Sequence, residues 1–426
     1  GKVIRIRTGL DTSDKFPQIS DEELLTKVQQ QTFRYFWEGA EPTSGMARER
    51  TSSGATVTTG GTGFGVMAMT VAAERGFVTR SEACQRVQRI VTFLAERATS
   101  YHGAFSHWID GQTGQTLPFS ADDNGADLVE TGLLFQGLLT ARAYFDGADA
   151  AESKLRADIT ALWEAVEWDF FTKEGTEKVL YWHWSPDKGW AMNMPIQGWN
   201  EALIVYVLAA SSPTHPIGRE VYAEGWARGG AMRNGKLFYD TVLPLGEDYG
   251  GPLFWAQYSF LGLNPRGLSD AYADYWEQVC NHTRINYAYC VDNPKGYAGY
   301  GADCGGLTAS DIPDGYTASS PTNDRGVIAP TAALSSMPYT PDESMAALRF
   351  FYYKLGDKLW SDYGFIDAFD LTTGWFDRGM HIAIDQGPIV VMIENYRTGL
   401  PWNLFMSDKD VQRGLAELGF TVEAGS

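Results

Sequence analysis

Apolar residues recur at helical spacing through most of the chain, whereas alternating, strand-type patterns are scarce. Capping boxes, in which a Ser or Thr and a Glu three residues later exchange hydrogen bonds, stand at Ser20–Glu23 and Thr79–Glu82. We expect a helix behind each box, the second one ending near Ala98. Helices are also expected to start near Phe64 and Asn124, and helical patterns recur at 151–168, 200–211, 217–228, 268–288, 342–355, 385–397 and 408–417.

The connections between these helices are long, and residues 1–19 lack any periodicity. One connection, residues 291–326, exceeds 30 residues and is crowded with Gly, Asp and Tyr. Because a loop of that length in a compact domain is usually functional, we expect it to form a wall of a cleft. The pattern predicts an N-terminal arm at 1–19 and a single all-α domain at 20–426. Roughly ten to twelve helices with long connections favour an α/α barrel, with a plain bundle or solenoid as the alternative.

Composition and charge narrow the partners that this chain can have. The net charge is −19, which disfavours binding to nucleic acid or to an anionic membrane. No apolar run approaches the ~20 residues of a membrane span. The 14 Trp and 21 Tyr residues suit a groove for sugars, although a large helical core could also absorb them. We therefore expect a neutral substrate, no nucleic acid partner and no membrane span.

Residues 181–203 gather four Trp residues into a short segment that Gly and Pro interrupt: Trp182, Trp184, Trp190 and Trp199. Glu201 follows them at the start of a predicted helix. Flat indole faces stack on sugar rings, and a carboxylic acid can protonate a glycosidic oxygen. Core indoles beside a Glu that complements the helix N-terminus explain the same pattern equally well.

Three further carboxylates stand in settings that suit acid–base chemistry. Asp127 and Glu130 lie three residues apart on one helical face, where mutual repulsion would raise the pKa of one of them. A solvated polar face is the alternative. Asp385 precedes an apolar helix, and an N-cap role explains it better from the residues alone. Because the chain has no HExxH, GxSxG or phosphate-loop motif, hydrolysis by paired carboxylates is the chemistry that remains.

Eight segments resemble the bacterial glycoamylase-like family, in the expected order and over nearly the whole chain after residue 20. They are GTGFGVMAM (61–69), DNGADLVETGLLFQGLL (123–139), VLYWHWSPDKGW (179–190), QGWNEALIVYVLAASSPTHPI (197–217), GPLFWAQYSFLGLNPRG (251–267), GVIAPTAALSSMPYTPDESMAALRFFY (326–352), YGFIDAF (363–369) and IDQGPIVVMIENYRTGL (384–400). This family contains glycoside hydrolase family 144, whose characterised members are β-1,2-glucanases. The resemblance implies an (α/α)6 barrel with long cleft-forming loops, and cleavage with inversion.

The same resemblance implies roles for the carboxylates. Glu201 matches the general acid and Asp385 the general base, while Asp127 and Glu130 would position the water or sugar hydroxyls. In an inverting glycosidase the acid and the base stand ~6.5–9.5 Å apart, which leaves room for the attacking water. Trp199 departs from the family pattern, in which a Tyr is expected, and this puts the linkage and length of the substrate in question.

The leading hypothesis is an inverting glycoside hydrolase of β-1,2-glucan or sophoro-oligosaccharides that uses no cofactor and no metal. Substrate subsites are assigned to Arg50, Trp182, Trp184, Trp190, Trp199, Gln257, Tyr258, Arg266 and Trp375. For each arginine, a structural ion pair is an equal alternative. A non-catalytic carbohydrate-binding protein of a sugar-uptake system and a hydrolase of another β-glucoside linkage are the rival functions. We also expect a monomer that is periplasmic or secreted.

Overall fold

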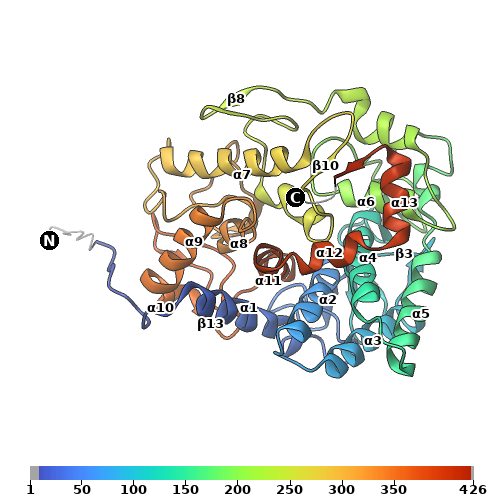
Figure 1. The fold of residues 1–426 in the computed structure, drawn as a ribbon, viewed down its shortest axis with the longest axis horizontal. Coiled ribbons are helices and arrows are strands. Elements are labelled where there is room, and N and C mark those ends of the chain that lie inside the picture. Colours follow the sequence, from blue (N-terminus) through green and yellow to red (C-terminus); the bar gives the residue numbers. More distant parts are fainter. Residues whose placement is uncertain (1–8, 424–426) are drawn as a thin grey trace.

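Helices dominate the computed structural model, which describes residues 9–423 (Figure 1). In that range, four helices are buried on nearly every side because their residues are mostly apolar or small: α2 (Thr59–Glu74), α4 (Leu128–Tyr144), α6 (Leu203–Ser211) and α11 (Ala383–Arg397). Helix α4 contacts both α2 and α6, and α11 contacts α2. These four helices therefore form one continuous inner layer.

A second set of helices buries only part of its surface and packs outside the inner layer: α1 (Asp21–Trp37), α3 (Arg80–Glu96), α5 (Ala150–Glu164) and α13 (Lys409–Leu418). Helix α1 packs on α2 and α11, α3 on α2, α5 on α4, and α13 on α6. Figure 1 shows α3 and α5 at the rim of the molecule. Each outer helix turns an apolar stripe inward and polar residues to solvent. The prediction of a helix-rich fold is confirmed.

The remaining helices of the described chain are α7 (Tyr275–Asp292), α8 (Pro330–Leu334), α9 (Pro341–Arg349), α10 (Gly356–Leu359) and α12 (Leu400–Met406). Two π-helical turns lie at Val221–Trp226 and Phe350–Lys354. Short 3-10 turns lie at Trp168–Thr172, Arg228–Gly230, Leu253–Ala256 and Tyr258–Phe260. Helices α8 and α9 pack on each other, and α8 also contacts α11.

Strands are two to four residues long in the described chain and connect the helices as small antiparallel pairs: β1 (Thr56–Thr58), β2 (Ser100–Tyr101), β3 (Ala104–Phe105), β4 (Trp108–Asp110), β5 (Thr116–Leu117), β6 (Ala126–Asp127), β7 (His183–Trp184), β8 (Leu237–Phe238), β9 (Thr241–Val242), β10 (Leu268–Ser269), β11 (Ala309–Ile312), β12 (Gly315–Ala318), β13 (Trp360–Ser361), β14 (Gly364–Phe365), β15 (Phe369–Asp370), β16 (Trp375–Phe376) and β17 (Thr421–Val422). One sheet has three strands, in the order β1-β4-β5, with Val57 opposite Ile109. The other pairs are β2-β3, β6-β7, β8-β9, β10-β17, β11-β12, β13-β14 and β15-β16.

Helices α2 and α4 touch backbone to backbone through two glycines. A Cβ on Gly137 would lie 2.1 Å from the carbonyl oxygen of Gly63, and a Cβ on Gly63 would lie 2.3 Å from that of Leu133. Only glycine permits so close an approach. The contact brings the first turns of both helices together, so that Glu130 on α4 faces Gly60 on α2.

Several local predictions are confirmed. Both capping boxes form, with Ser20 and Thr79 each accepting a hydrogen bond from the backbone N–H of the Glu three residues later. The helix expected near Asn124 begins later, at Leu128, because Asp127 is its N-cap. The N-cap explanation for Asp385 is wrong, because α11 starts at Ala383 with Ile382 as its N-cap.

The helix predicted at 217–228 is confirmed in part, because the stretch is helical but is not a regular α-helix. This stretch forms a π-helical turn followed by a 3-10 turn, and Gly229 takes a left-handed φ of 61° that ends regular helix. The loop at 291–326 contains the β11-β12 hairpin, which short-range patterns did not predict. Of the predicted arm, residues 1–8 lie outside the described residues, and residues 9–19 contain no helix or strand. No described helix is both long and apolar enough to cross a membrane.

The glycine contact gives a prediction about stability. We expect Gly137→Ala to lower the free energy of unfolding by about 3 kcal/mol, because the added methyl group must push α4 away from α2. Gly301→Ala is the control, since a Cβ there meets nothing within 4 Å, and it should stay within about 0.5 kcal/mol of wild type. Urea denaturation followed by circular dichroism measures both variants. Equal stabilities would show that α2 and α4 can separate at little cost.

Candidate active site

A cavity of about 350 Å³ has the size of a small-ligand site. Aromatic side chains form much of its wall: Trp108, Phe119, Trp182, Phe254, Tyr258 and Tyr316. Four carboxylic acids also line it: Glu49, Asp127, Glu130 and Glu201. Flat aromatic faces beside a few acids are the combination that binds and cleaves sugars.

The cavity meets the N-terminal ends of all four inner helices. Thr58 is the N-cap of α2, Asp127 that of α4 and Ile382 that of α11, while Glu201 stands just before α6. Helix dipoles place partial positive charge at these ends, which favours carboxylates there. The fold therefore provides a place where several acids can be buried together.

Asp127 and Glu130 bind the first turns of their helices. The Oδ1 atom of Asp127 accepts the backbone N–H of Glu130 at 2.9 Å, which caps α4. The Oε2 atom of Glu130 accepts the N–H of Gly60 at 2.5 Å and the hydroxyl of Thr58 at 3.4 Å, so it binds the start of α2. Both acids are buried, which contradicts the alternative of a solvated polar face.

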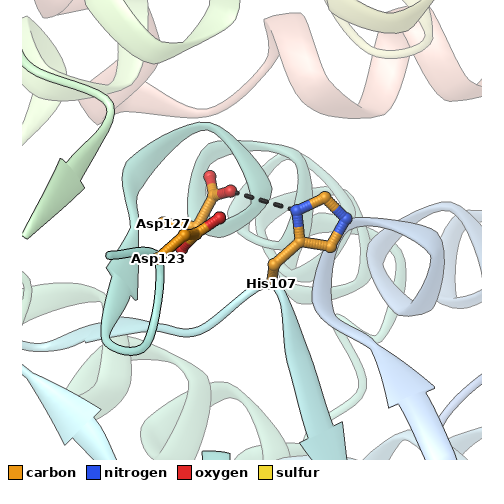
Figure 2. Close-up of side chains that lie close together, drawn as sticks. All are labelled: His107, Asp123 and Asp127. Carbon is orange, nitrogen blue, oxygen red and sulfur yellow. Dashed lines mark ion pairs between the residues drawn. The ribbon is translucent and has the colours of Figure 1, made fainter. Parts of the chain in front are cut away.

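His107 lies between these two acids. Its Nδ1 atom is 3.3 Å from Oδ2 of Asp127, and its Nε2 atom is 3.7 Å from Oε1 of Glu130. Figure 2 shows the ring of His107 turned toward Asp127. Burial lowers the pKa of His107, but the charges of Glu130 and Asp127 outweigh it and raise that pKa to about 9. In turn, burial raises the pKa of Asp127, but His107 and then His183 hold it below its ordinary value. Asp127 is therefore ionised at neutral pH.

For the two other acids near Asp127, the effect of burial is not outweighed. It raises the pKa of Glu130, against the opposing charge of His107. It also raises the pKa of Asp123, whose Oδ2 atom is 3.5 Å from Nε2 of His183. The acids of this cavity thus differ in their affinity for protons, and only Asp127 is made more acidic.

Glu201 occupies the turn that leads into α6. Its carbonyl oxygen accepts the Ser259 hydroxyl at 2.5 Å, which fixes the backbone there. Burial, with smaller contributions from Asp127 and Glu130, raises the pKa of Glu201 to about 7. Glu201 therefore keeps a proton to near-neutral pH, as a general acid must.

Asp385, the predicted base, is 2% exposed and is not among the residues that line the cavity. Burial raises the pKa of Asp385 well above its ordinary value, and the neighbouring Asp367 raises it further. Burial also raises the pKa of Asp367 to about 6. Asp385 and Asp367 thus form a buried pair of acids, in which burial and the neighbouring carboxylate favour the protonated form of Asp385.

Three predicted subsite residues line the cavity. Trp182 and Tyr258 belong to its aromatic wall, and Tyr258 packs against Phe64 with ring centroids 5.0 Å apart. Arg50 lines it too, but its guanidinium is engaged by Glu49 at 2.8 Å and by Asp311 at 2.8 Å. For Arg50, the ion-pair alternative is therefore the one that the structure displays.

The other indoles of residues 181–203 do not reach the cavity wall. Trp184 packs edge-on against His102, and Trp190 packs against Phe170. Trp199 is 4% exposed and donates its indole N–H to Nδ1 of the buried His282 at 3.3 Å. The core explanation of the Trp-rich segment thus fits Trp199 and the cavity explanation fits Trp182.

The three remaining candidates also lie away from the cavity wall. Gln257 is buried and donates to the carbonyl oxygen of Ala332 and the hydroxyl of Ser336. The guanidinium of Arg266 stacks on the rings of Trp276 and Trp402, with 4.8 and 5.3 Å to the centroids. Trp375 lies in the β15-β16 hairpin, outside the cavity lining.

The cavity contains residues that the sequence did not single out, chiefly His107, Trp108, Phe119 and Tyr316. His107 and Trp108 flank the start of β4, and Tyr316 belongs to β12. No motif marks them, because short strands far from Glu201 in sequence carry them to the site. A weak signal was present in the excess of aromatic residues.

Two groups of described side chains have the spacing that a metal ion would require. They are His107, Asp123 and Asp127, and Asp311, Asp367 and Asp377, each with ligand atoms within 4.8 Å of one another. In the first group the His107 ring already pairs with Asp127, and in the second Arg50 already pairs with Asp311. We assign a metal to neither group.

The raised pKa of Glu201 predicts how stability depends on pH. Because its folded pKa of about 7 exceeds its ordinary value of 4.5, wild type loses stability as pH rises between those values. We expect Glu201→Gln to be more stable than wild type above pH 7, by up to about 3 kcal/mol, and equal to it below pH 4.5. Thermal unfolding at pH 4.5 and 8 measures this. The exposed Glu96→Gln is the control, and an unchanged difference across pH would contradict the shift.

Comparison with known proteins adds independent evidence. The family model "Glycoamylase", described as "Putative glucoamylase", matches residues 193–409, just over half of the chain. A curated relative from Parabacteroides distasonis, named exo beta-1,2-glucooligosaccharide sophorohydrolase (non-reducing end), is 47% identical over 421 residues. The match covers 94% of this chain and 58% of the relative, so the chain spans little more than half of that relative's length.

Two solved structures superpose on almost the whole chain. A "putative glucoamylase" from Bacteroides uniformis is 57% identical, with a TM-score of 0.94 and coverage of 96% of this chain and 100% of that one. An endo-beta-1,2-glucanase from Chitinophaga pinensis, solved with sophorotriose and glucose, is 51% identical, with a TM-score of 0.92 and coverage of 95% and 99%. The resemblance noted in the sequence is confirmed, and the chain belongs to the glycoamylase-like family.

Proposed function

We propose that this chain is an inverting glycoside hydrolase that cleaves β-1,2-glucan or β-1,2-gluco-oligosaccharides. One observation carries the proposal: the aromatic-lined cavity holds Glu201, which keeps a proton near neutral pH, and Asp127, which does not. Glycosidases divide acid and base roles between carboxyl groups in this way. The names of the Parabacteroides and Chitinophaga relatives supply the linkage.

Glu201 would protonate the oxygen of the scissile bond while a carboxylate activates water on the other face of the sugar ring. Burial suits Glu201 to this role, because its raised pKa keeps the proton in place until the oxygen of the scissile bond becomes basic enough to accept it. Trp182 and Tyr258 would stack on the rings next to the bond.

Two carboxylates compete for the role of base. Asp127 is ionised and lines the cavity, so it can receive a proton without rearrangement. Asp385, assigned from the family resemblance, lies outside the cavity lining, and burial beside Asp367 favours its protonated form. We therefore place Asp127 ahead of Asp385 as the base, and Asp385 stays a prediction that mutagenesis can decide.

The inner and outer helices support a further proposal, that the fold is an (α/α)6 barrel whose inner helices point their N-termini at the substrate. The pairing of α1 with α2, α3 with α2 and α5 with α4 is what successive inner and outer helices of such a barrel would give. A monomeric state and a periplasmic or secreted location remain predictions from the sequence.

The first test of the function is turnover of linear β-1,2-glucan and sophoro-oligosaccharides, with product size and anomeric form followed by NMR. We expect products of inverted configuration, and a loss of kcat of about 10³-fold in Glu201→Gln. Glu96→Gln, on the surface outside the cavity, should keep wild-type activity. Glucan binding without turnover by wild type would favour the carbohydrate-binding protein, and turnover of another linkage alone would overturn the β-1,2 assignment.

A second test identifies the base. We expect Asp127→Asn to lower kcat by about 10²- to 10⁴-fold, with partial rescue by azide, an anionic nucleophile that can attack in place of water without a base to activate it. Asparagine also caps helices well, so α4 should keep its start. Asp149→Asn, at the N-cap of α5, is the matched control. If azide rescued only Asp385→Asn, the role of base would return to Asp385.

A further inference from the structure

His107 has no role in the function proposed so far, yet its ring forms part of the cavity wall. It follows β3 and precedes β4, and its side chain is 28% exposed toward the cavity. The ring of Phe119 covers one face, with centroids 4.6 Å apart at 33°, and Trp108 meets it edge-on at 5.7 Å. These contacts hold the imidazole plane in one orientation.

In that orientation, both ring nitrogens face a carboxylate. Nδ1 is 3.3 Å from Asp127 and Nε2 is 3.7 Å from Glu130. A neutral imidazole carries a proton on only one nitrogen and would turn the lone pair of the other toward a negative charge. When both acids are ionised, only the doubly protonated ring is attracted to both of them at once.

The two acids depend on this ring for positive charge. Among the residues that the structure describes, neither Asp127 nor Glu130 pairs with a Lys or Arg, and His107 is the one side chain that pairs with both. Asp127 is 1% exposed, and its buried Oδ2 atom has no hydrogen bond in the described chain. Glu130 accepts two further hydrogen bonds, from groups at the start of α2. The loss of His107 would therefore affect Asp127 more than Glu130.

Other titratable groups around the ring add to its charge balance. Asp123 approaches from the loop before β6, and its charge also favours the protonated ring. His183, on β7 and outside the cavity lining, is 3.9 Å from Asp127 and 3.5 Å from Asp123. Glu201, before α6, is coupled to Asp127 and Glu130 by charge.

We propose that His107 is a positioning residue that remains a cation throughout the neutral range and keeps Asp127 and Glu130 both ionised. The inference deepens the hydrolase proposed above and rests on it. The charge of His107 lowers the pKa of both acids, and their negative charges in turn favour a proton on Glu201. Without that cation, one of the two acids takes up a proton, and Asp127 can no longer accept one from water.

Histidine NMR tests the charge without any need for activity. In ¹⁵N-histidine-labelled wild type, we expect the His107 nitrogens, assigned by their loss in His107→Gln, to show a doubly protonated ring at pH 7 that titrates near pH 9. A neutral ring at pH 7 would overturn the proposal. So would pH-independent shifts that change on addition of EDTA or Zn²⁺, because a metal-bound imidazole carries no extra proton. Wild type that shows the cation but no turnover would overturn the hydrolase instead.

Kinetics then tests the positioning role. We expect His107→Gln to lose about 100-fold in kcat with little change in KM, and the acid limb of its pH profile to move to higher pH as Asp127 becomes harder to ionise. His107→Arg, which restores a cation and can extend into the cavity, should recover part of the loss.

His215→Gln removes another His–Asp pair, at 3.2 Å and outside the cavity, and should behave as wild type. Equal loss in the Gln and Arg variants with an unmoved pH profile would leave His107 a purely structural residue. If His107→Gln does not fold, His107→Arg carries the comparison against wild type.

Discussion

The backbone contact between Gly63 and Gly137 is the constraint on which the site depends. It brings α2 and α4 together without intervening side chains, and so the first turn of one helix lies beside that of the other. Glu130, rooted on α4, can then bind the free N–H of Gly60 on α2. A carboxylate that belongs to one helix thereby completes the hydrogen bonding of its neighbour, and packing and charge placement become a single feature.

Burying several acids in one cavity is costly unless positive charge compensates them. This protein supplies the charge from two sources: the N-terminal ends of the inner helices, and the imidazole of His107 between Asp127 and Glu130. Glu201 stands before an inner helix, but among the described residues no imidazole pairs with it, so burial dominates there and raises its pKa. The acids therefore differ in proton affinity because the compensating positive charge lies close to some of them and not to others.

Predictions from the sequence were correct where contacts within one helical turn decide the structure. The capping boxes at Ser20 and Thr79 need only residues within one turn, and both form. The family resemblance placed Glu201 in the cavity. Trp182 and Trp199, close neighbours in sequence, could not be told apart, because His282 on a distant helix decides that Trp199 is buried.

His107 was missed for the same kind of reason. Its role depends on two acids about twenty residues further along the chain. The short strands that bring His107 and these acids together show no periodic pattern in the sequence. Asp385 and Asp367 posed a related problem. They lie 18 residues apart in sequence, and only the packed structure shows that they are neighbours. Long-range electrostatics of this kind appears only when distant segments are assembled.

The β11-β12 hairpin has a consequence for how such an enzyme can change. It contributes Tyr316 to the cavity wall, while the acids are fixed to the ends of inner helices. A hairpin between two long connections tolerates insertion and replacement far better than packed helices do. The reactive acids and part of the cavity wall therefore lie on different segments of the chain, which can change independently. Descendants of such a scaffold can alter which stretch of a polymer they admit while their chemistry stays the same.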